Sequence, residues 1–268
     1  MRTMVVPREH GAWGMLLVPL ATGAVVAARV GVHTAALVLF ICAAVSLFWL
    51  RTPVESWLGT STIKAHTSGE RAFVLRTIVG VSVIAAASIA LLLWNGRNRE
   101  LLLIGLIAAL AFAAQAIVKK LGRNGRMPAQ VIGAIGLTSA AAGAYCVATG
   151  QLDRTAIALW MANWLFAGDQ IHFVQLRIHS SRADTVAQRF QQGRAFLFAQ
   201  IVLIGTILAS YRVGLFPAAV FLAFVPVLFR GTAWLVRKRQ PLDVHKLGFA
   251  ELAHALLFGA LICAAFLI

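Results

Sequence analysis

Long apolar runs alternate with short polar segments along the whole chain. The runs are about 17 to 21 residues long, the length at which an α-helix crosses the hydrocarbon core of a bilayer. The pattern predicts an all-α fold: one domain, residues 1–268, forming a polytopic membrane helical bundle of about nine transmembrane helices. The predicted spans are residues 11–30, 34–50, 77–94, 101–118, 131–149, 155–174, 195–211, 213–229 and 249–268.

The composition supports a membrane protein. Hydrophobic residues make up 60% of the chain and charged residues 12%, whereas a soluble domain carries about 25% charge. Cys42, Cys146 and Cys263 lie inside apolar spans without metal-ligand or disulfide spacing, so we expect them to be packing residues. Residues 1–29 are similar to a signal peptide, but the following helices need this segment as a partner, which argues against cleavage.

Lysine and arginine are distributed unequally between the two sides of the predicted bundle. We call the side that holds the N-terminus side A and the opposite side side B. Side A carries 19 of the 24 Lys and Arg residues, and side B carries five. The positive-inside rule therefore predicts a bacterial cytoplasmic (inner) membrane protein with its N-terminus inside and its C-terminus outside. The net charge of +15 then reflects orientation, and we expect no nucleic-acid partner.

The sixth predicted span carries polar residues where an apolar surface is expected. At 100° per residue, Asn163, Gln170 and Arg177 share one stripe of the helix. Asp169 and His172 lie on an adjoining face. Ionisable groups at membrane depth are costly, so their presence indicates a functional site. The alternative is that the helix ends with the predicted span and leaves these groups among lipid headgroups.

Three further polar clusters fall on side A. Glu9 and His10 precede the first span, and Arg51 and Glu55 follow the second, where Pro53 is expected to break the helix. The third cluster comprises Glu251 and His254 in the ninth span, with Asp243 and His245 before it. Structural alternatives exist, because Glu9 and Glu251 could be ordinary helix caps and Arg51–Glu55 an exposed ion pair.

These clusters combine several cations with few carboxylates, which is chemistry suited to holding a phosphate or diphosphate headgroup. Mg²⁺ needs carboxylates together with phosphate oxygens, so a magnesium site is only weakly supported and no metal ligands are identified. The predicted substrate-binding residues are Arg51, Glu55, Asn163, Gln170 and Arg177. The predicted catalytic, proton-transferring residues are Glu9, His10, Asp169 and His172.

Small residues recur every four positions in the fifth span, at Gly136, Ala140 and Ala144. This spacing lets membrane helices approach one another closely. We interpret it as a packing seam.

Two sequence resemblances bear on the fold. The opening P-R-E-H-G-A-W-G-M-L-L-V-P-L-A-T-G is similar to the signature of the YwiC-like family of bacterial membrane proteins. The later stretches N-W-L-F-A-G-D-Q-I-H-F-V-Q-L-R and K-L-G-F-A-E-L-A-H-A-L-L-F are similar to that family's later segments. This resemblance implies a membrane protein but brings little function with it.

A more distant resemblance is architectural. Nine helices, an N-terminus inside and polar sites after helices two and six resemble the intramembrane prenyltransferases of the UbiA superfamily, whose Asp-rich loops hold Mg²⁺ and a prenyl diphosphate. This chain departs from that pattern, with Arg51-Thr52-Pro53-Val54-Glu55 at the first motif and Asp169 followed by Phe173 and Arg177 at the second. Only Glu55, Asp169 and Asn163 carry over, which puts metal-dependent ionisation in doubt.

Three classes of function follow from these patterns. The first is binding of an anionic lipid or isoprenoid headgroup in a polar cavity on side A, with or without prenyl transfer. The second is a transporter or permease, and the third is a non-catalytic partner in a membrane complex. The first class requires the cationic ends of helices one, two and six to meet around one pocket.

Overall fold

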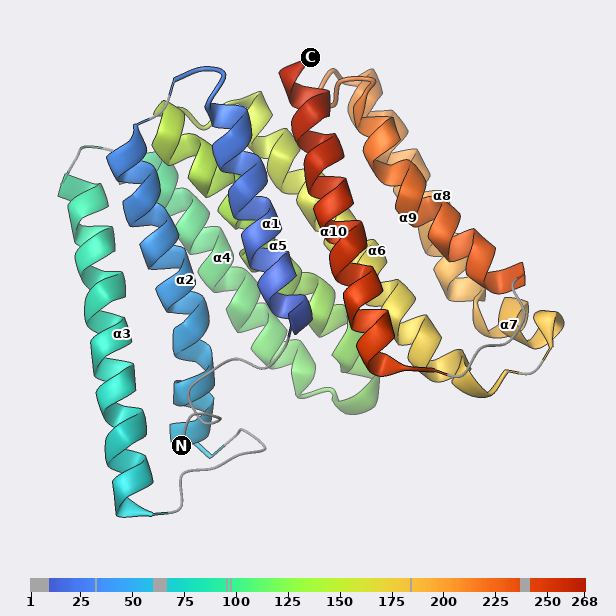
Figure 1. Ribbon diagram of the computed structural model, residues 1–268, viewed down its shortest axis with the longest axis horizontal. Helices are drawn as coiled ribbons and strands as arrows, with labels where there is room; N and C mark the ends of the chain where they lie inside the picture. Colours follow the sequence, from blue (N-terminus) through green and yellow to red (C-terminus); the bar gives the residue numbers. More distant parts are fainter. Residues whose placement is uncertain are drawn as a thin grey trace.

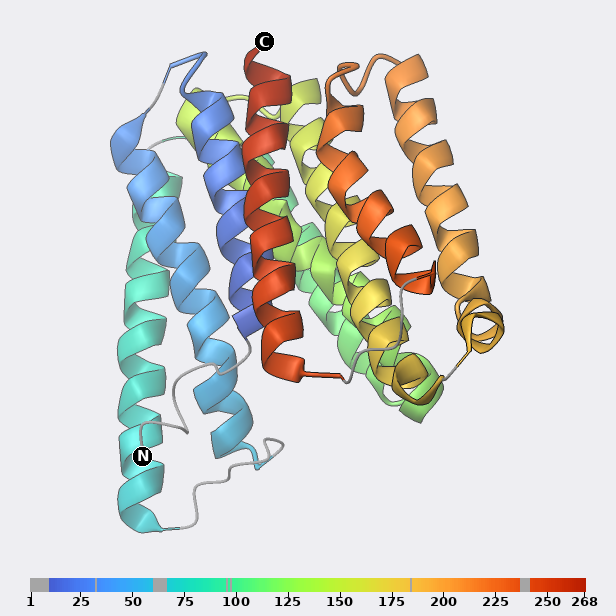
Figure 2. The same cartoon turned by 45° about the vertical axis from the view of Figure 1, so that its right-hand side comes forward.

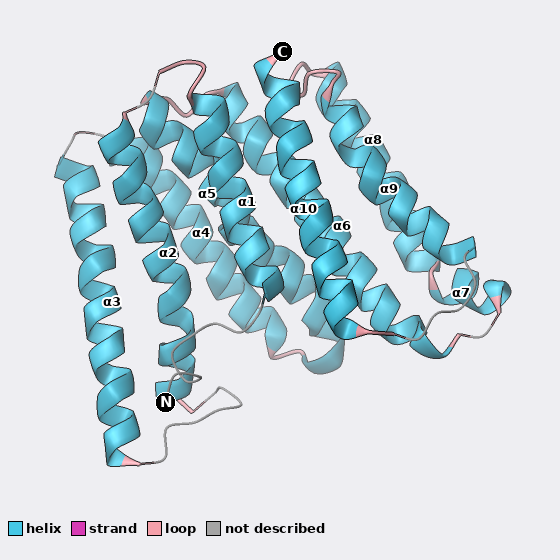
Figure 3. Ribbon diagram, viewed as in Figure 1, coloured by secondary structure: helices cyan, strands magenta, loops and turns pink. Residues whose placement is uncertain are grey.

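The computed structural model describes residues 10–31, 33–59, 67–94, 96, 98–183, 185–236 and 242–268. Within these residues the chain forms helices and connecting turns, with no strand (Figure 3). This arrangement confirms the predicted all-α class. The helices run roughly side by side, and the chain's C-terminus lies at the end of the bundle opposite the start of the first helix (Figure 1).

Each predicted span corresponds to one long helix in the described part of the chain. Six of these helices are long and apolar enough to cross a membrane, and α1 and α9 contain shorter apolar segments. The protein is therefore of the membrane type, while the count of nine spans stays a prediction. The long helices are α1 (His10–Ala27), α2 (Thr34–Trp57), α3 (Ser68–Trp94), α4 (Asn98–Lys119), α5 (Arg126–Thr149), α6 (Arg154–His179), α8 (Arg194–Arg212), α9 (Val220–Val236) and α10 (Val244–Leu267).

The largest errors in the predicted boundaries concern α2 and α3. The expectation that Pro53 breaks α2 is wrong, because the helix continues through it to Trp57. Proline removes one backbone donor, but the remaining hydrogen bonds carry the helix on past it. α3 begins at Ser68, where the Thr67 hydroxyl accepts from the Glu70 N–H and the Glu70 carboxylate accepts from the Thr67 N–H. This reciprocal cap starts the helix before its apolar run.

The segments around α6 and α8 also differ from the prediction. α6 continues to His179, so the alternative in which it ends with the predicted span is wrong. A short 3-10 turn, η3 (Ser180–Arg182), and the short helix α7 (Val186–Gln192) then lead into α8. The turn between α8 and α9 occupies residues 213–219, with Gly214 at a positive φ of 71°. This turn is longer than predicted, because the predicted spans 195–211 and 213–229 are separated by Arg212 alone.

α5 is the centre of the bundle, because its small side chains let four other helices pack against it. α1, α2, α4 and α6 all contact α5. The predicted seam is confirmed: Gly136 lies against Phe112 of α4, and Ala140 and Ala144 are buried in a cluster with Leu16 of α1. Close approach of this kind maximises van der Waals contact where no hydrophobic effect drives helix association.

The first and last helices lie side by side, as Figures 1 and 2 both show. Gly259 of α10 faces Val18 and Thr22 of α1, and on side B the Arg29 guanidinium donates to the carbonyl of Phe266. α1 thereby joins the α2–α5 part of the bundle to the part built from α6, α8, α9 and α10.

Candidate anion-binding site between α6, α9 and α10

The polar stripe of α6 forms as predicted, and two of its three members link neighbouring helices. The buried Asn163 amide donates to the Thr22 hydroxyl of α1 at 3.1 Å and to the Leu159 carbonyl at 2.8 Å. The Gln170 amide donates to the backbone carbonyl of Glu251 in α10 at 2.9 Å. Both side-chain amide nitrogens are therefore engaged in packing between helices.

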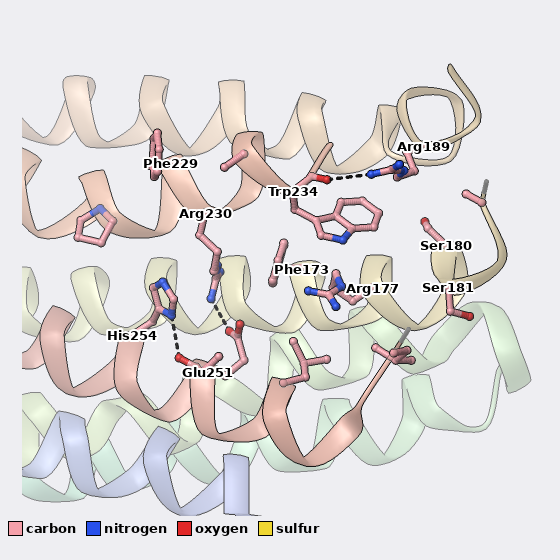
Figure 4. A pocket seen from close by; sticks show the side chains of 16 residues that line it. Phe173, Arg177, Ser180, Ser181, Arg189, Phe229, Arg230, Trp234, Glu251 and His254 are labelled. Carbon is pink, nitrogen blue, oxygen red and sulfur yellow. Dashed lines mark hydrogen bonds and ion pairs between the residues drawn. The ribbon is translucent and has the colours of Figure 1, made fainter. Parts of the chain in front are cut away.

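Asp169 belongs to a buried charge network that joins four helices. Its carboxylate accepts one hydrogen bond from the Gln200 amide of α8 and a second, at 2.7 Å, from the Arg230 guanidinium of α9. Arg230 also pairs with the Glu251 carboxylate of α10, as Figure 4 shows. The Asp169 side chain is only 1% exposed. One guanidinium thus compensates two carboxylates that would be costly to bury alone.

The start of α10 determines where Glu251 lies. The Asp243 carboxylate accepts hydrogen bonds from the backbone N–H groups of His245 and Lys246, and the bond from Lys246 lowers the pKa of Asp243 below its usual range. α10 therefore begins at Val244, and Glu251 lies in its third turn. The alternative in which Glu251 caps the helix is wrong, since Asp243 is the cap.

A cavity of about 370 Å³ opens beside this network, among the side-A ends of α6, α9 and α10. Among the described residues, three guanidinium groups line it, those of Arg177, Arg189 and Arg230, against one carboxylate, that of Glu251. Seen close by in Figure 4, the other polar groups on its wall are the Ser180 and Ser181 hydroxyls and the His254 ring. The buried Ser180 hydroxyl has no hydrogen-bond partner within the described part of the chain. The wall is therefore predominantly cationic and rich in hydrogen-bond donors.

Arg177 differs from the other two cavity arginines in its contacts. Arg230 pairs with carboxylates, and Arg189 of α7 donates to the Trp234 carbonyl at 3.4 Å. The Arg177 guanidinium instead lies 5.7 Å from the centre of the Trp234 ring and 6.0 Å from that of Phe173. It makes no ion pair with another described residue. Aromatic contacts hold this cation in place while leaving its N–H groups able to donate to an anion.

The remaining predicted site residues lie elsewhere. His172 turns its ring edge toward Phe196 of α8 at 5.4 Å and does not line the cavity. Arg51 and Glu55 form an exposed pair at 3.0 Å on α2, beside a different cavity. Glu9 lies outside the described residues, as does the side chain of His10. The prediction that Arg51, Glu55 and Arg177 share one pocket is therefore wrong, because packing against α5 places α2 and α6 on different flanks of that helix.

Arg230, Gln200 and Trp234 are not among the predicted site residues, although all three belong to the network or line the cavity. The predicted span ends at Phe229, one residue before Arg230, whereas α9 continues seven residues further, to Val236. A signal was present, since Arg230 is the only charged residue in this 17-residue helix. A lone ionisable residue among apolar neighbours indicates a buried partner.

The donor set does not fit a magnesium–diphosphate site. Asp169 and Glu251 are both bonded to Arg230, and Glu55 is bonded to Arg51. No cluster of three metal-ligating side chains occurs among the described residues. Carboxylates that already neutralise arginines are poor ligands for a divalent cation. The site therefore offers anion capture by arginine.

Comparisons with known proteins place the chain in a family. The family model described as YwiC-like protein matches residues 6–145, which extend from the start of the chain to near the end of α5. No curated protein and no solved structure matches the chain. The family match covers more than half of the sequence and includes the opening motif that starts at Pro7. The chain belongs to the YwiC-like protein family.

Proposed function

We propose that this protein binds the anionic headgroup of a membrane amphiphile, a phosphate or diphosphate, in the cavity between α6, α9 and α10. The observation that carries the proposal is Arg177, a half-buried cation that is held by two aromatic rings and makes no ion pair with a described residue, since Glu251 on the same wall is paired with Arg230. Burying an arginine without an anion is costly, so a ligand anion would stabilise the site.

Access from the bilayer supports an amphiphile over a soluble anion. On α9 the cavity extends from Trp234 to Pro226, about 12 Å along the helix axis. Phe229 lines it and is 68% exposed on the surface of the bundle. The positive-inside rule puts this end at the cytoplasmic leaflet. A lipid or isoprenoid headgroup could therefore reach Arg177 laterally while its chain remains in the membrane.

Packing beyond the cavity favours binding over permeation. One or two turns toward side B, Phe166 of α6 stacks on Phe258 of α10 with ring centres 4.2 Å apart, and Phe224 of α9 packs against the same ring at 5.3 Å. All three rings are buried. Prenyl transfer would be a further step at this site, but the donor set favours headgroup capture without a metal.

The test is native mass spectrometry of the purified full-length protein with geranyl diphosphate, with and without Mg²⁺. We expect binding without Mg²⁺ that weakens about 10- to 100-fold in Arg177→Ala, the size of a lost hydrogen bond to a charged group. Arg194→Ala is the matched control, because Arg194 is exposed near the same end of the bundle and does not line the cavity.

Inorganic diphosphate is the second probe. Comparing it with geranyl diphosphate distinguishes a soluble anion from the headgroup of an amphiphile. The proposal requires geranyl diphosphate to bind more tightly, because its chain adds apolar contact. Equal binding of the two probes would contradict the proposal that the ligand is an amphiphile. Binding that is unchanged in Arg177→Ala, or absent both with and without Mg²⁺, would contradict the proposal that an anionic headgroup binds in this cavity.

A further inference from the structure

A second and larger cavity lies in the other half of the bundle. It has a volume of about 850 Å³ and lies between α2, α4 and α5, and the last turns of α3 line its side-B end. α2 and α4 both pack on α5 but make few or no contacts with each other through their described residues. A groove therefore remains above α5, with α2 and α4 as its walls.

The groove is smooth and apolar along most of its length. Its floor is formed by α5, where small residues such as Gly136, Ser139 and Ala140 keep the surface low. Phe40 and Phe48 stand on the α2 wall. The α4 wall is mainly aliphatic, and its members Leu102 and Leu106 are more than half exposed. Such a surface offers close van der Waals contact to a flexible hydrocarbon chain.

The charged lining residues gather at one end of the groove, together with Gln115. Arg51, Glu55, Gln115 and Lys119 line the groove near the side-A ends of α2 and α4. Arg51 pairs with Glu55, whereas Lys119 makes no ion pair within the described part of the chain. The polar end is therefore net cationic and complements an anionic headgroup.

The length of the groove limits the kind of chain that fills it. Its α4 wall runs from Leu101 to Lys119, about 27 Å at the rise of an α-helix. The hydrocarbon core of a bilayer is about 30 Å thick, so an ordinary acyl chain from one leaflet ends near the middle of the groove. A chain that nearly spans the bilayer would contact the whole groove.

We propose that this groove binds a membrane amphiphile with one long hydrocarbon chain, whose anionic headgroup lies at Lys119 and Arg51. The site is separate from the Arg177 cavity and goes beyond the proposed function, because it uses other helices and recognises the chain as well as the charge. The two proposals can fail independently.

The test uses an alkyl phosphate with one chain of about 27 Å, long enough to reach from Lys119 to Leu101, and a diazirine at the end of that chain. The full-length protein is placed in bilayer nanodiscs with this probe, irradiated, digested and analysed by mass spectrometry. We expect crosslinks near Leu92 and Leu101, which line the side-B end of the groove. A dodecyl phosphate probe with the same diazirine should label residues nearer the middle of α4, because its chain is shorter.

Gly105→Leu is the blocking variant. A Cβ at Gly105 would meet no atom within 4 Å, and the residue lines the groove, so the rest of a leucine side chain extends from open space into the chain site. We expect about tenfold less crosslinking, since the chain and the leucine compete for one volume. Gly80→Leu is the control, because Gly80 of α3 is exposed with equal space around it and does not line the groove.

The charged end is tested with Lys119, the last residue of α4, and with Lys120, which follows it. Lys119→Ala should lower crosslinking roughly fivefold, as expected for an exposed ion pair. Lys120→Ala should leave it unchanged, because Lys120 does not line the groove. Arg177→Ala should also leave it unchanged, which separates this site from the other cavity.

Three results would overturn the proposal. Crosslinks spread evenly over the exposed faces of α3 and α8 would mean ordinary lipid contact. Absence of labelling at the groove residues with either probe would mean that no chain of this kind enters the groove. Labelling that persists in Gly105→Leu would mean that the chain lies elsewhere. The control for folding is thermal unfolding: a midpoint at or above that of the wild type would show that this variant is folded.

Discussion

Arg230 is the residue whose surroundings explain most about the C-terminal half of the bundle. Its guanidinium bonds Asp169 and Glu251 and lies 4.2 Å from the centre of the Phe173 ring. Two carboxylates and one guanidinium leave a net negative charge in a region that is nearly closed to solvent. Arg177, which lines the cavity with Glu251, brings a second cation to the same wall.

Loss of this cation should destabilise the protein strongly. We expect Arg230→Met to lower the free energy of unfolding by about 3 to 5 kcal/mol, because the two buried carboxylates lose their shared partner. Denaturation in mixed micelles would measure the change, with Arg194→Met as the exposed control. Neutralising all three groups, with Asp169→Asn and Glu251→Gln added, should recover most of the loss. A loss below about 1 kcal/mol in Arg230→Met would contradict the network.

At the scale of elements, the contact between α1 and α5 depends on the absence of a side chain at Gly23. A Cβ at this position would clash with the backbone carbonyl of Ala141. Backbone atoms cannot rotate away as a flexible side chain can, so the two helices would have to separate. The same approach brings Leu16 and Leu20 of α1 against α5.

Gly23→Ala should therefore be destabilising even though alanine favours helices. We expect a loss of about 1 to 3 kcal/mol from overpacking. Gly80→Ala on the exposed face of α3 is the matched control, and it should gain about 0.5 to 1 kcal/mol from helix propensity, because no atom lies near its added Cβ. Unfolding in mixed micelles compares the two variants. Equal shifts of the same sign would show that the α1–α5 contact is looser than described.

At the scale of the whole molecule, the charge asymmetry and the alternation of helices predict the orientation in the membrane. Gln151 lies between α5 and α6 at the side-B end, and Gln192 lies in α7 at the side-A end; both are exposed. The protein as it stands carries three free cysteines, so the test starts from a variant in which these are alanine.

Single cysteines introduced at these two positions should lie on opposite sides of the membrane. In intact bacterial cells whose outer membrane has been made permeable, we expect a membrane-impermeant maleimide to label Gln151→Cys and to spare Gln192→Cys. Lysis should expose both, which controls for accessibility. Labelling of Gln192→Cys alone before lysis would mean that the bundle is inserted the other way round.

The sequence predicts the helices well because the length and polarity of each apolar run determine where a helix is favourable in a membrane. It misplaces their ends where caps or polar turns extend a helix beyond its apolar run, as at Thr67 before α3 and at Asp243 before α10. Asp169 and Arg177 could be found because they interrupt a predicted span or follow it closely. Arg230, the partner of Asp169, could not be paired with it, because the position of α9 beside α6 depends on packing among helices distant in sequence.

The neighbouring positions of α1 and α10 have a consequence for biogenesis. A ribosome delivers helices to the membrane in chain order, so α1 enters long before the helix that covers its outer flank. Until then the surface around Val18 and Thr22 faces lipid or an insertion factor, because Gly259 of α10 and Asn163 of α6 have not yet arrived. The first helix is therefore fully enclosed only once α10 has entered the membrane beside it.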